Sequence, residues 1–268
     1  MKAKKVLFIT TEMLPFVGES HNATMGRYLP QAIQDLGHEI RTFTPKWGNI
    51  NERRNQLHEV IRLSGMNLII DETDHPLIIK VASLQAAHMQ IYFIDNDDYF
   101  MKRQITTNEA GEEYDDNGER AIFYARGVLE TLKKLRWVPD VIHCHGWISA
   151  LAPLYIKKAY QDEPSFCDAK VVFSVGADDL KKDLGRKSLG CIPFKGAVME
   201  DVNDVCQTQY TQTELMKIAT KFSDGIIIDK PEVDPSIIEY AKSIGVPVLA
   251  YQGEEYAQAY SDFYETVV

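Results

Sequence analysis

VLFIT at residues 6–10 is an unbroken apolar run, and VVFSV (171–175) and GIIID (225–229) repeat its pattern later in the chain. Strands that are covered by helices on both faces have continuous apolar runs, whereas half-exposed strands alternate. Helical patterns separate these runs, which is typical of βαβ units. The sequence therefore predicts an α/β fold with a Rossmann-like, doubly wound and mainly parallel sheet.

The other elements follow outward from these runs. We expect strands at 5–10, 39–44, 77–83, 90–95, 140–145, 170–175, 225–228 and 247–251. Helical spacing predicts helices at 26–36, 117–135, 148–159, 213–222, 235–243 and 254–266. The stretch 178–204 has the weakest pattern and is expected to be a long loop. No Pro/Ser-rich linker divides the chain, so residues 1–268 are expected to form one domain.

Composition and charge exclude some classes of binding partner and indicate where the protein is located. Hydrophobic residues make up 45% of the chain, which is enough for a core without disulfides or metals. The net charge of -10 argues against nucleic acid and anionic membranes as partners. The four cysteines form no C-x-x-C pair, and the first apolar run is too short for a signal peptide or a membrane span. We therefore expect a cytoplasmic protein with reduced thiols.

The turn after the first strand does not fit a phosphate-binding loop. Gly18 and Gly26 are too far apart for G-x-G-x-x-G, and Glu19 adds a negative charge. We expect a surface loop, with Asn22 or Thr24 capping the helix that follows.

The segment VIHCHGW at residues 141–147 holds two histidines at a predicted strand end. Side chains alternate along a strand, so His143 and His145 share one face. His143 is expected to be a packing residue. For His145 a ligand-site role and a packing role both stay open, because ligands bind at the carboxyl ends of parallel strands. No third metal ligand lies nearby at a recognisable spacing, so no metal site is expected.

Acidic residues cluster in two places, at 95–98 and 112–116, without the glycine of a calcium loop. We expect solvated loop charge there, with Asp116 or Asn117 capping the long helix and Glu119 and Arg120 exposed on its first turn. No nucleophile elbow, P-loop or zinc-protease motif is present in the sequence. The chain thus carries no complete catalytic motif.

Five segments together resemble the N-terminal domain of bacterial glycogen and starch synthases. They are VLFITTEMLPFV (6–17), LPQAIQDLGHEIRTFTPKW (29–47), IYFIDNDDYFMKR (91–103), DDNGERAIFYARGVLE (115–130) and VIHCHGWISALAPLYIKK (141–158). A later segment, ELMKIATKFSDGIIID (214–229), is also similar. The resemblance implies one half of a GT-B fold and a role in transfer of glucose from ADP-glucose to an α-glucan, with no further cofactor.

The residues that would bind the nucleotide sugar depart from the family pattern. Gly18 stands at the lysine of the family's K-T-G-G-L loop, and Glu19, Ser20, His21 and Asn22 follow it. The family's H-D-W-H segment is His145, Gly146, Trp147 and Ile148, and its later His-Asn pair is Gly176 and Ala177. The ligand-binding candidates that remain are His145, Trp147, Gly18, His21 and Gly176. Among them His145 is the one catalytic candidate.

Three functional hypotheses follow from this resemblance. The sequence stops where the second GT-B domain would begin, so we expect a stand-alone, synthase-like domain of α-glucan metabolism that does not transfer glucose by itself. It would bind a glucan or a protein partner, and the candidates for stacking on sugar rings are exposed aromatic side chains, among them Trp47, Trp147, Tyr251, Tyr256, Tyr260 and Tyr264. The spacing of the four tyrosines fits better with one helix face packed on the domain. The alternative is an ADP-glucose-dependent glucosyltransferase acting with a separate donor-binding subunit. A third is a small-molecule sensor with a crevice rebuilt around His21, His145 and Asp178.

Overall fold

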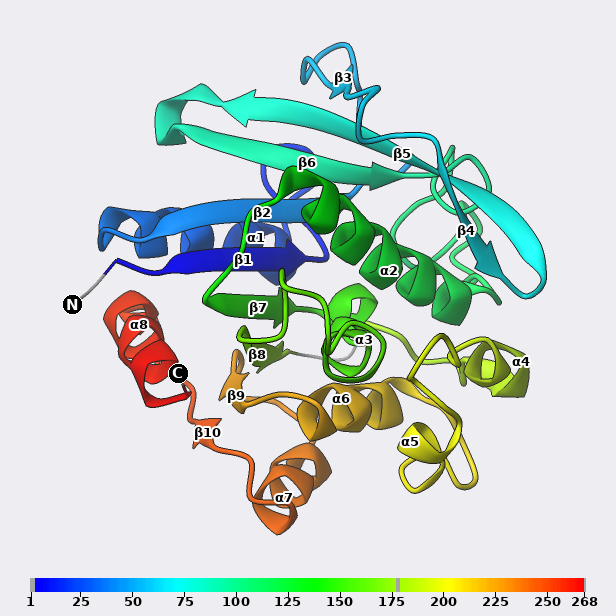
Figure 1. The fold of residues 1–268 in the computed structure, drawn as a ribbon, viewed down its shortest axis with the longest axis vertical. Helices are drawn as coiled ribbons and strands as arrows, with labels where there is room; N and C mark the ends of the chain where they lie inside the picture. Colours follow the sequence, from blue (N-terminus) through cyan, green and yellow to red (C-terminus); the bar gives the residue numbers. More distant parts are fainter. Residues whose placement is uncertain (1–2, 177–178, 268) are drawn as a thin grey trace.

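Parallel strands form the centre of the molecule, in a ten-stranded sheet with the order β10-β9-β8-β7-β1-β2-β6-β5-β3 (Figure 1). The computed structural model describes residues 3–176 and 179–267. The parallel strands are β1 (Lys5–Thr10), β2 (Glu39–Pro45), β6 (Met89–Asp95), β7 (Val141–His145), β8 (Lys170–Val175), β9 (Gly225–Ile228) and β10 (Val248–Leu249). The predicted mainly parallel sheet is confirmed, although β10 is shorter than expected.

The antiparallel edge of the sheet was only partly predicted. Strand β5 (Thr73–Leu84) pairs with β6, and β4 (Met66–Ile70) and the short β3 (His58–Glu59) pair with β5. The two-residue turn between β4 and β5 is Asp71–Glu72, with both residues at positive φ. Such turns are usually marked by Asn-Gly or Asp-Gly, so the sequence carried no hairpin signal here.

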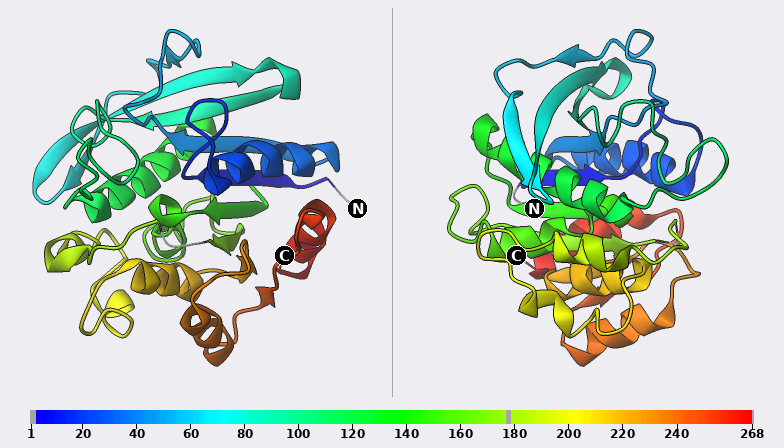
Figure 2. Two further views of the ribbon diagram at one scale, coloured as in Figure 1. Left: turned by 180° about the vertical axis from the view of Figure 1, so that it is seen from behind. Right: turned by 90° about the vertical axis from the view of Figure 1, so that its right-hand side faces the viewer.

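Helices cover both faces of the sheet (Figure 2). Helices α1 (His21–Asp35) and α8 (Tyr256–Val267) pack on one face, and α2 (Asn117–Leu135), α3 (Ala152–Lys158) and α6 (Gln212–Lys221) lie on the other. A hydrophobic core lies on each face of the sheet, and alternate residues of β1 belong to one or the other. Val6 and Phe8 face α1 and α8, while Leu7 and Ile9 face α2. This two-sided burial explains the continuous apolar runs.

Several element boundaries differ from the prediction. Helix α1 begins at His21 rather than at residue 26, and the expected helix 148–159 is divided into a 3₁₀ turn at Trp147–Ser149 and α3. The expected long loop contains the short helices α4 (Gly185–Gly190) and α5 (Glu200–Asn203), while its first residue, Asp178, lies outside the described residues. Helix α7 (Pro235–Ser243) agrees with the prediction.

The first turn of α2 is buried, so the predicted exposure of Glu119 and Arg120 is wrong. Glu119 accepts a hydrogen bond from Ser188 of α4, and Arg120 donates to carbonyl groups of the segment 99–105. Asp116 occupies the N-cap position as expected, but its carboxylate pairs with Arg103 instead of capping the helix. The loops that cover this turn come from elsewhere in the chain, where helical periodicity gives no information.

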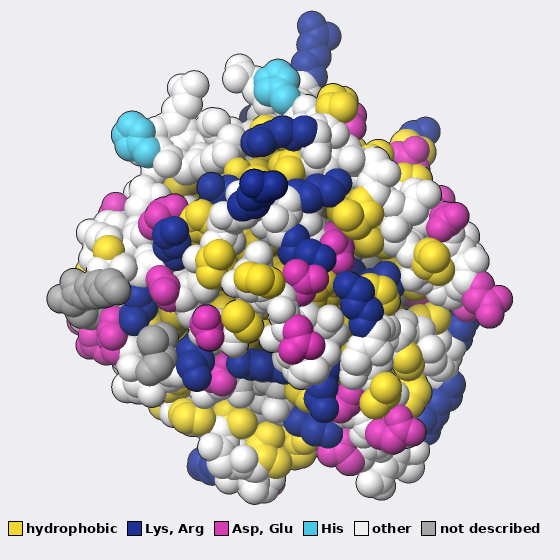
Figure 3. Space-filling model, viewed as in Figure 1, with side chains coloured by type: hydrophobic (Ala, Val, Ile, Leu, Met, Phe, Trp, Pro, Cys, Tyr) yellow, Lys and Arg dark blue, Asp and Glu magenta, His cyan; other side chains and the backbone are white. Residues whose placement is uncertain are grey.

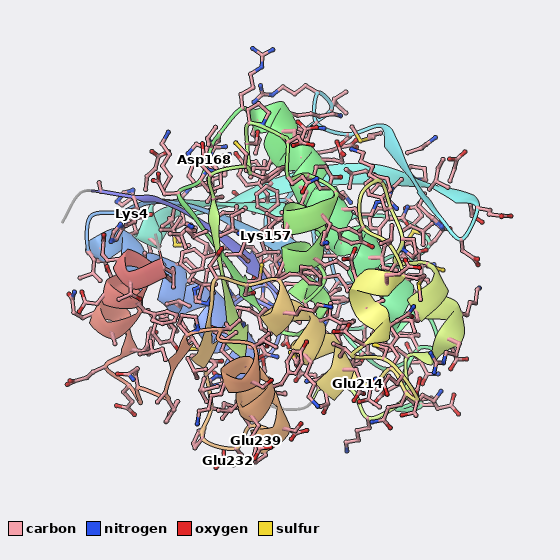
Figure 4. The ribbon with its side chains drawn as sticks, turned by 60° about the horizontal axis from the view of Figure 1, so that its bottom comes forward. Lys4, Lys157, Asp168, Glu214, Glu232 and Glu239 are labelled. Carbon is pink, nitrogen blue, oxygen red and sulfur yellow. The ribbon has the colours of Figure 1, made fainter. Side chains whose placement is uncertain are left out.

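Helix α8 is held to the amino-terminal region by two contacts. Lys4, which Figure 4 labels beside this helix, forms a 3.3 Å ion pair with Glu265. His38 is buried, and its Nδ1 accepts a hydrogen bond from the Lys4 N–H at 3.1 Å while its Nε2 lies 3.0 Å from Ser261 Oγ. The acceptor role of Nδ1 requires the neutral imidazole.

Burial lowers the pKa of His38, so we expect stability to depend on pH through this side chain. Its contribution is complete above pH ~6.5, the value in an unfolded chain, and is lost as the pH falls from there toward the lowered folded-state pKa. In a His38→Asn variant the amide does not titrate. Urea unfolding at pH 8, 6.5 and 5 should therefore show a smaller loss of stability in His38→Asn, by roughly 1 kcal/mol. Equal losses in the two proteins would contradict this role.

Charged side chains of both signs are interspersed over the face shown in Figure 3.

Among the described residues, no helix is both long and apolar enough to cross a bilayer.

Candidate functional site

The candidate site lies where the strand order reverses. The chain runs from β1 to β2 and β6 on one side, and β7, β8 and β9 follow on the other side of β1. The carboxyl ends of β1 and β7 are linked by a hydrogen bond from Thr11 Oγ1 to the His145 carbonyl, at 3.1 Å. In open parallel sheets ligands bind at this switch point, which here brings the ends of β7 and β9 close to the start of α1.

Three side chains from distant elements meet at the switch point. His145 ends β7, Asp229 directly follows β9, and His21 is the first residue of α1. The Nε2 atoms of His21 and His145 lie 2.7 Å and 2.8 Å from the same carboxylate oxygen, Asp229 Oδ2. Tyr260 of α8 lies 3.4 Å from the other oxygen, Oδ1. We call His21, His145 and Asp229 the His–Asp–His cluster.

The start of α1 places His21 in this cluster. Ser20 is the N-cap residue: its Oγ accepts from the Ala23 N–H at 2.9 Å and donates to Glu12 at 2.8 Å. The prediction that Asn22 or Thr24 caps the helix is therefore wrong. Gly26 lets the helix approach the strand end, because a Cβ there would lie 1.9 Å from the Glu12 carbonyl oxygen.

The predicted surface loop is confirmed at Gly18, Glu19 and Ser20, which are exposed, but Glu12 and Asn22 on either side of them belong to the site. Asn22 is buried and donates to Asp179 Oδ2 at 2.9 Å and to Glu12 Oε1 at 3.5 Å. Glu12 is also buried. Capping signals and charges in the sequence predicted that the whole segment is solvated. Only the packing of α1 against the strand ends removes Glu12 and Asn22 from water.

Carboxylates dominate the electrostatics of the cluster. Burial alone would lower the pKa of His145, but the carboxylates of Asp229, Asp179 and Glu12 raise it. Burial would raise the pKa of Asp229, and the two histidines hold it well below its usual range. Burial raises the pKa of Glu12, and the charge of Asp179 raises it further. The site therefore stabilises positive charge on His145.

The structure brings together three of the five predicted site residues. His145 and His21 belong to the cluster, and Gly176 lies beside it, since a Cβ at Gly176 would be 3.9 Å from Asp229 Oδ2. Gly18 lies before α1 with open space around it. Ala177 and Asp178 lie outside the described residues.

Trp147 and Trp47 are buried, so their predicted exposure is wrong. Their rings lie 6.4 Å apart beneath the site, and Trp47 Nε1 donates to the Thr11 carbonyl at 2.7 Å. In residues 3–176 and 179–267, Trp147 Nε1 has no hydrogen-bond partner. Tyr260 and Tyr264 are buried on α8 as packing residues, whereas Tyr251 is 45% exposed. The tryptophans therefore support the site instead of offering a surface for stacking.

His143 is a packing residue, in agreement with the prediction. Its ring is buried between α8 and the sheet and forms 2.6 Å hydrogen bonds with Tyr264 Oη and Ser174 Oγ.

Asp229 is the main residue that the sequence analysis missed. It follows an apolar strand directly, as His145 ends one, and the rule that places parallel strand ends at one edge of the sheet could have identified it. The sequence analysis considered only His143 with His145 as metal ligands, whereas the structure brings ligand atoms of His21, His145 and Asp229 within 4.8 Å of one another.

Comparison with known proteins gives the family. The model of the starch synthase catalytic domain matches residues 5–245. The chain belongs to this family. Glycogen synthase from Chlorobium phaeobacteroides is 35% identical over 243 residues, which are 85% of this chain and 48% of the relative. Glycogen synthase from Chlorobium limicola is 40% identical over 192 residues, which are 71% of this chain and 38% of the relative. This starch synthase-like chain thus spans about half the length of these relatives or less.

Two solved structures share the fold. The catalytic domain of starch synthase IV from Arabidopsis thaliana, bound to ADP and acarbose, has a TM-score of 0.75 at 17% identity, over 93% of this chain and 51% of that chain. A sucrose-phosphate synthase structure from Thermosynechococcus elongatus has a TM-score of 0.50 at 11% identity, over 98% and 99% of the two chains. The starch synthase-like chain therefore has the architecture of one half of a GT-B fold.

Proposed function

We propose that this starch synthase-like chain acts in α-glucan metabolism without transferring glucose from ADP-glucose by itself. The observation that carries the proposal is the gathering of carboxylates at the switch point: Asp229 Oδ2 lies 2.8 Å from His145 Nε2, and Glu12 and Asp179 both accept hydrogen bonds from Asn22. Transfer from a nucleotide sugar requires positive charge that holds the diphosphate as the leaving group develops. Carboxylates in a partly buried site repel that diphosphate.

The loop before α1 supports the same proposal. Gly18 stands at the family's lysine position and carries no charge, and the next residue is Glu19. The unpaired cysteines, Cys144, Cys167, Cys191 and Cys206, favour a cytoplasmic location as part of this proposal.

Release of ADP tests the absence of transfer. The purified chain is incubated with ADP-glucose and glycogen, and ADP is measured with a coupled enzyme assay, beside a full-length bacterial glycogen synthase as positive control. We expect no ADP above the background of enzyme-free hydrolysis. Glycogen-dependent release by the chain alone would overturn the proposal.

We further propose that a groove beside α1 binds the glucan. This groove has a volume of about 670 Å³, and its lining includes Arg27, Tyr28, Arg54 and Gln85. Tyr28 is 50% exposed, and Arg27 lies 5.3 Å from the centre of its ring. An exposed ring offers an apolar face for a sugar, and the arginine and amide groups can hydrogen-bond sugar hydroxyls.

Tyr28→Ala should weaken glycogen binding by roughly five- to tenfold, the effect of losing one aromatic stacking partner. The measurement is co-sedimentation with glycogen over a range of glycogen concentrations. Met101→Ala is the matched control, because Met101 is 50% exposed and is not among the residues that line this groove. If the wild-type protein does not sediment with glycogen, or if both variants bind equally, the groove is not a glucan site.

Family membership supports a second candidate, an ADP-glucose-dependent glucosyltransferase acting with a separate donor-binding subunit. The starch synthase IV structure that this chain resembles is bound to ADP, and this chain covers 51% of it. Isothermal titration with ADP-glucose discriminates the two candidates. Heat of binding that appears only with a partner protein would favour the second candidate, and none in any combination would eliminate it.

A further inference from the structure

We propose that the His–Asp–His cluster is a binding site for one divalent transition-metal ion of the Zn²⁺ type. Two histidines and one carboxylate form a common zinc ligand set, and a water molecule or a bound ligand completes the tetrahedron. The inference concerns the switch point that also carries the proposed function, and an ion bound there would offset part of the carboxylate charge; its tests measure metal binding alone.

The ligand geometry needs little adjustment. In a tetrahedral zinc site, bond lengths of about 2.0–2.2 Å place ligand atoms roughly 3.3 Å apart. Here the two histidine nitrogens lie 2.7 Å and 2.8 Å from Asp229 Oδ2, and the three ligand atoms lie within 4.8 Å of one another. The two nitrogen–oxygen pairs therefore have to open by about half an ångström to admit an ion.

The surrounding charge favours a cation. His145 and Asp229 are buried, with side chains 2% and 1% exposed, and the carboxylates of Glu12 and Asp179 act on His145 in addition to Asp229. Carboxylates gathered in a low-dielectric environment repel one another, so additional positive charge at the cluster is favoured. A dication supplies that charge while leaving the imidazoles neutral, as metal ligation requires.

The site has an entry path from solvent. The side chain of His21 is 31% exposed, so an ion can reach the cluster from solvent at the start of α1. Gly176 has no side chain, and even a Cβ there would lie 3.9 Å from Asp229 Oδ2 and 4.0 Å from Asn22 Oδ1. Tyr260 lies 3.4 Å from Asp229 Oδ1 and can orient the carboxylate.

Metal titration of the full chain tests the site. Protein treated with a chelator and then freed of it is titrated with Co²⁺, followed by its visible absorption, and with Zn²⁺ by calorimetry. We expect one ion per chain and a Co²⁺ spectrum typical of four-coordinate sites. His21→Gln should weaken binding by about a hundredfold or more, since a ligand itself is lost. His21 is partly exposed, and thermal unfolding of the metal-free variant checks that it folds.

The matched control is another histidine–carboxylate pair. His75 Nδ1 lies 2.8 Å from Asp98 Oδ2, and His75→Gln should leave metal affinity unchanged within about twofold. Absence of stoichiometric binding by the wild-type protein would overturn the proposal. So would binding that His21→Gln leaves intact, or that His75→Gln weakens equally. These readouts do not depend on glucose transfer or glycogen binding, so their failure leaves the proposed function untouched.

Discussion

Arg120→Met is expected to lower the free energy of unfolding by about 3–5 kcal/mol, the effect of leaving buried polar groups without their charged partner. The Arg120 side chain is fully buried at the first turn of α2. It donates to the carbonyl oxygens of residues 99, 104 and 105 at 3.0, 2.7 and 2.8 Å, and to Asn117 Oδ1 at 2.8 Å. Methionine has a similar length but no donor, so these acceptors lose their hydrogen bonds while they stay buried.

The Arg120 side chain is positively charged in this buried position. Burial and the nearby charge of Arg103 lower the pKa of Arg120 to about 9, so the side chain remains protonated at neutral pH. The guanidinium also lies 5.0 Å from the ring centre of Trp47 and 4.9 Å from that of Tyr114. Arg120→Lys should also be destabilising, because an ammonium cannot donate in so many fixed directions.

Urea unfolding at constant pH measures the effect of Arg120→Met. Arg62→Ala is the control, because Arg62 is exposed, and its change should stay within about 0.5 kcal/mol. If Arg120→Met lost no more than Arg62→Ala, the hydrogen bonds of the guanidinium would not stabilise the fold.

Gly146→Asp, which introduces the residue that the family carries at this position, is expected to destabilise the protein by about 3 kcal/mol or more. Gly146 has φ 83° and ψ 168°, a region of backbone conformation that is essentially restricted to glycine. A Cβ there would also lie 2.1 Å from Thr11 Oγ1, which donates the hydrogen bond that links β1 to β7. The aspartate therefore requires both a strained backbone and the loss of this link.

Gly18→Lys is the matched comparison, since it introduces the family's lysine at another position where this chain differs from the family pattern. A Cβ at Gly18 meets nothing within 4 Å, so this variant should unfold within about 0.5 kcal/mol of the wild-type protein. Thermal and urea unfolding of the two variants would separate the effects. A stable Gly146→Asp protein would show that the end of β7 can readily adopt the family's form.

The parts of the fold that were predicted from sequence are those with a strong local pattern. The boundaries of β1, β8, β9 and α2 agree with the expected ranges, because each buries a long, regular apolar stripe. The antiparallel strands β3 and β4 were not predicted. Strand β3 has only two residues, and β4 is joined to β5 by a turn without the usual sequence signal. The start of α1 was placed five residues late, because His21 to Met25 include polar residues that only the site buries.

The candidate site was predicted in part. The end of β7 was identified from strand alternation, which placed His143 and His145 on one face. The exposure of Arg120 was mispredicted because arginine is seldom fully buried, whereas the segment 99–105 covers it here.

By itself, the sequence determined the α/β class, the parallel strands and membership of the starch synthase family, because hydrophobic periodicity and motifs are local properties of the chain. The tertiary structure alone decided that His21 and His145 share Asp229, from which they are separated by 208 and 84 residues. Such a meeting depends on strand order and on how closely α1 approaches the sheet. Neither is recorded in the spacing of residues along the chain, since crossover connections of different length can bring the same strand ends together.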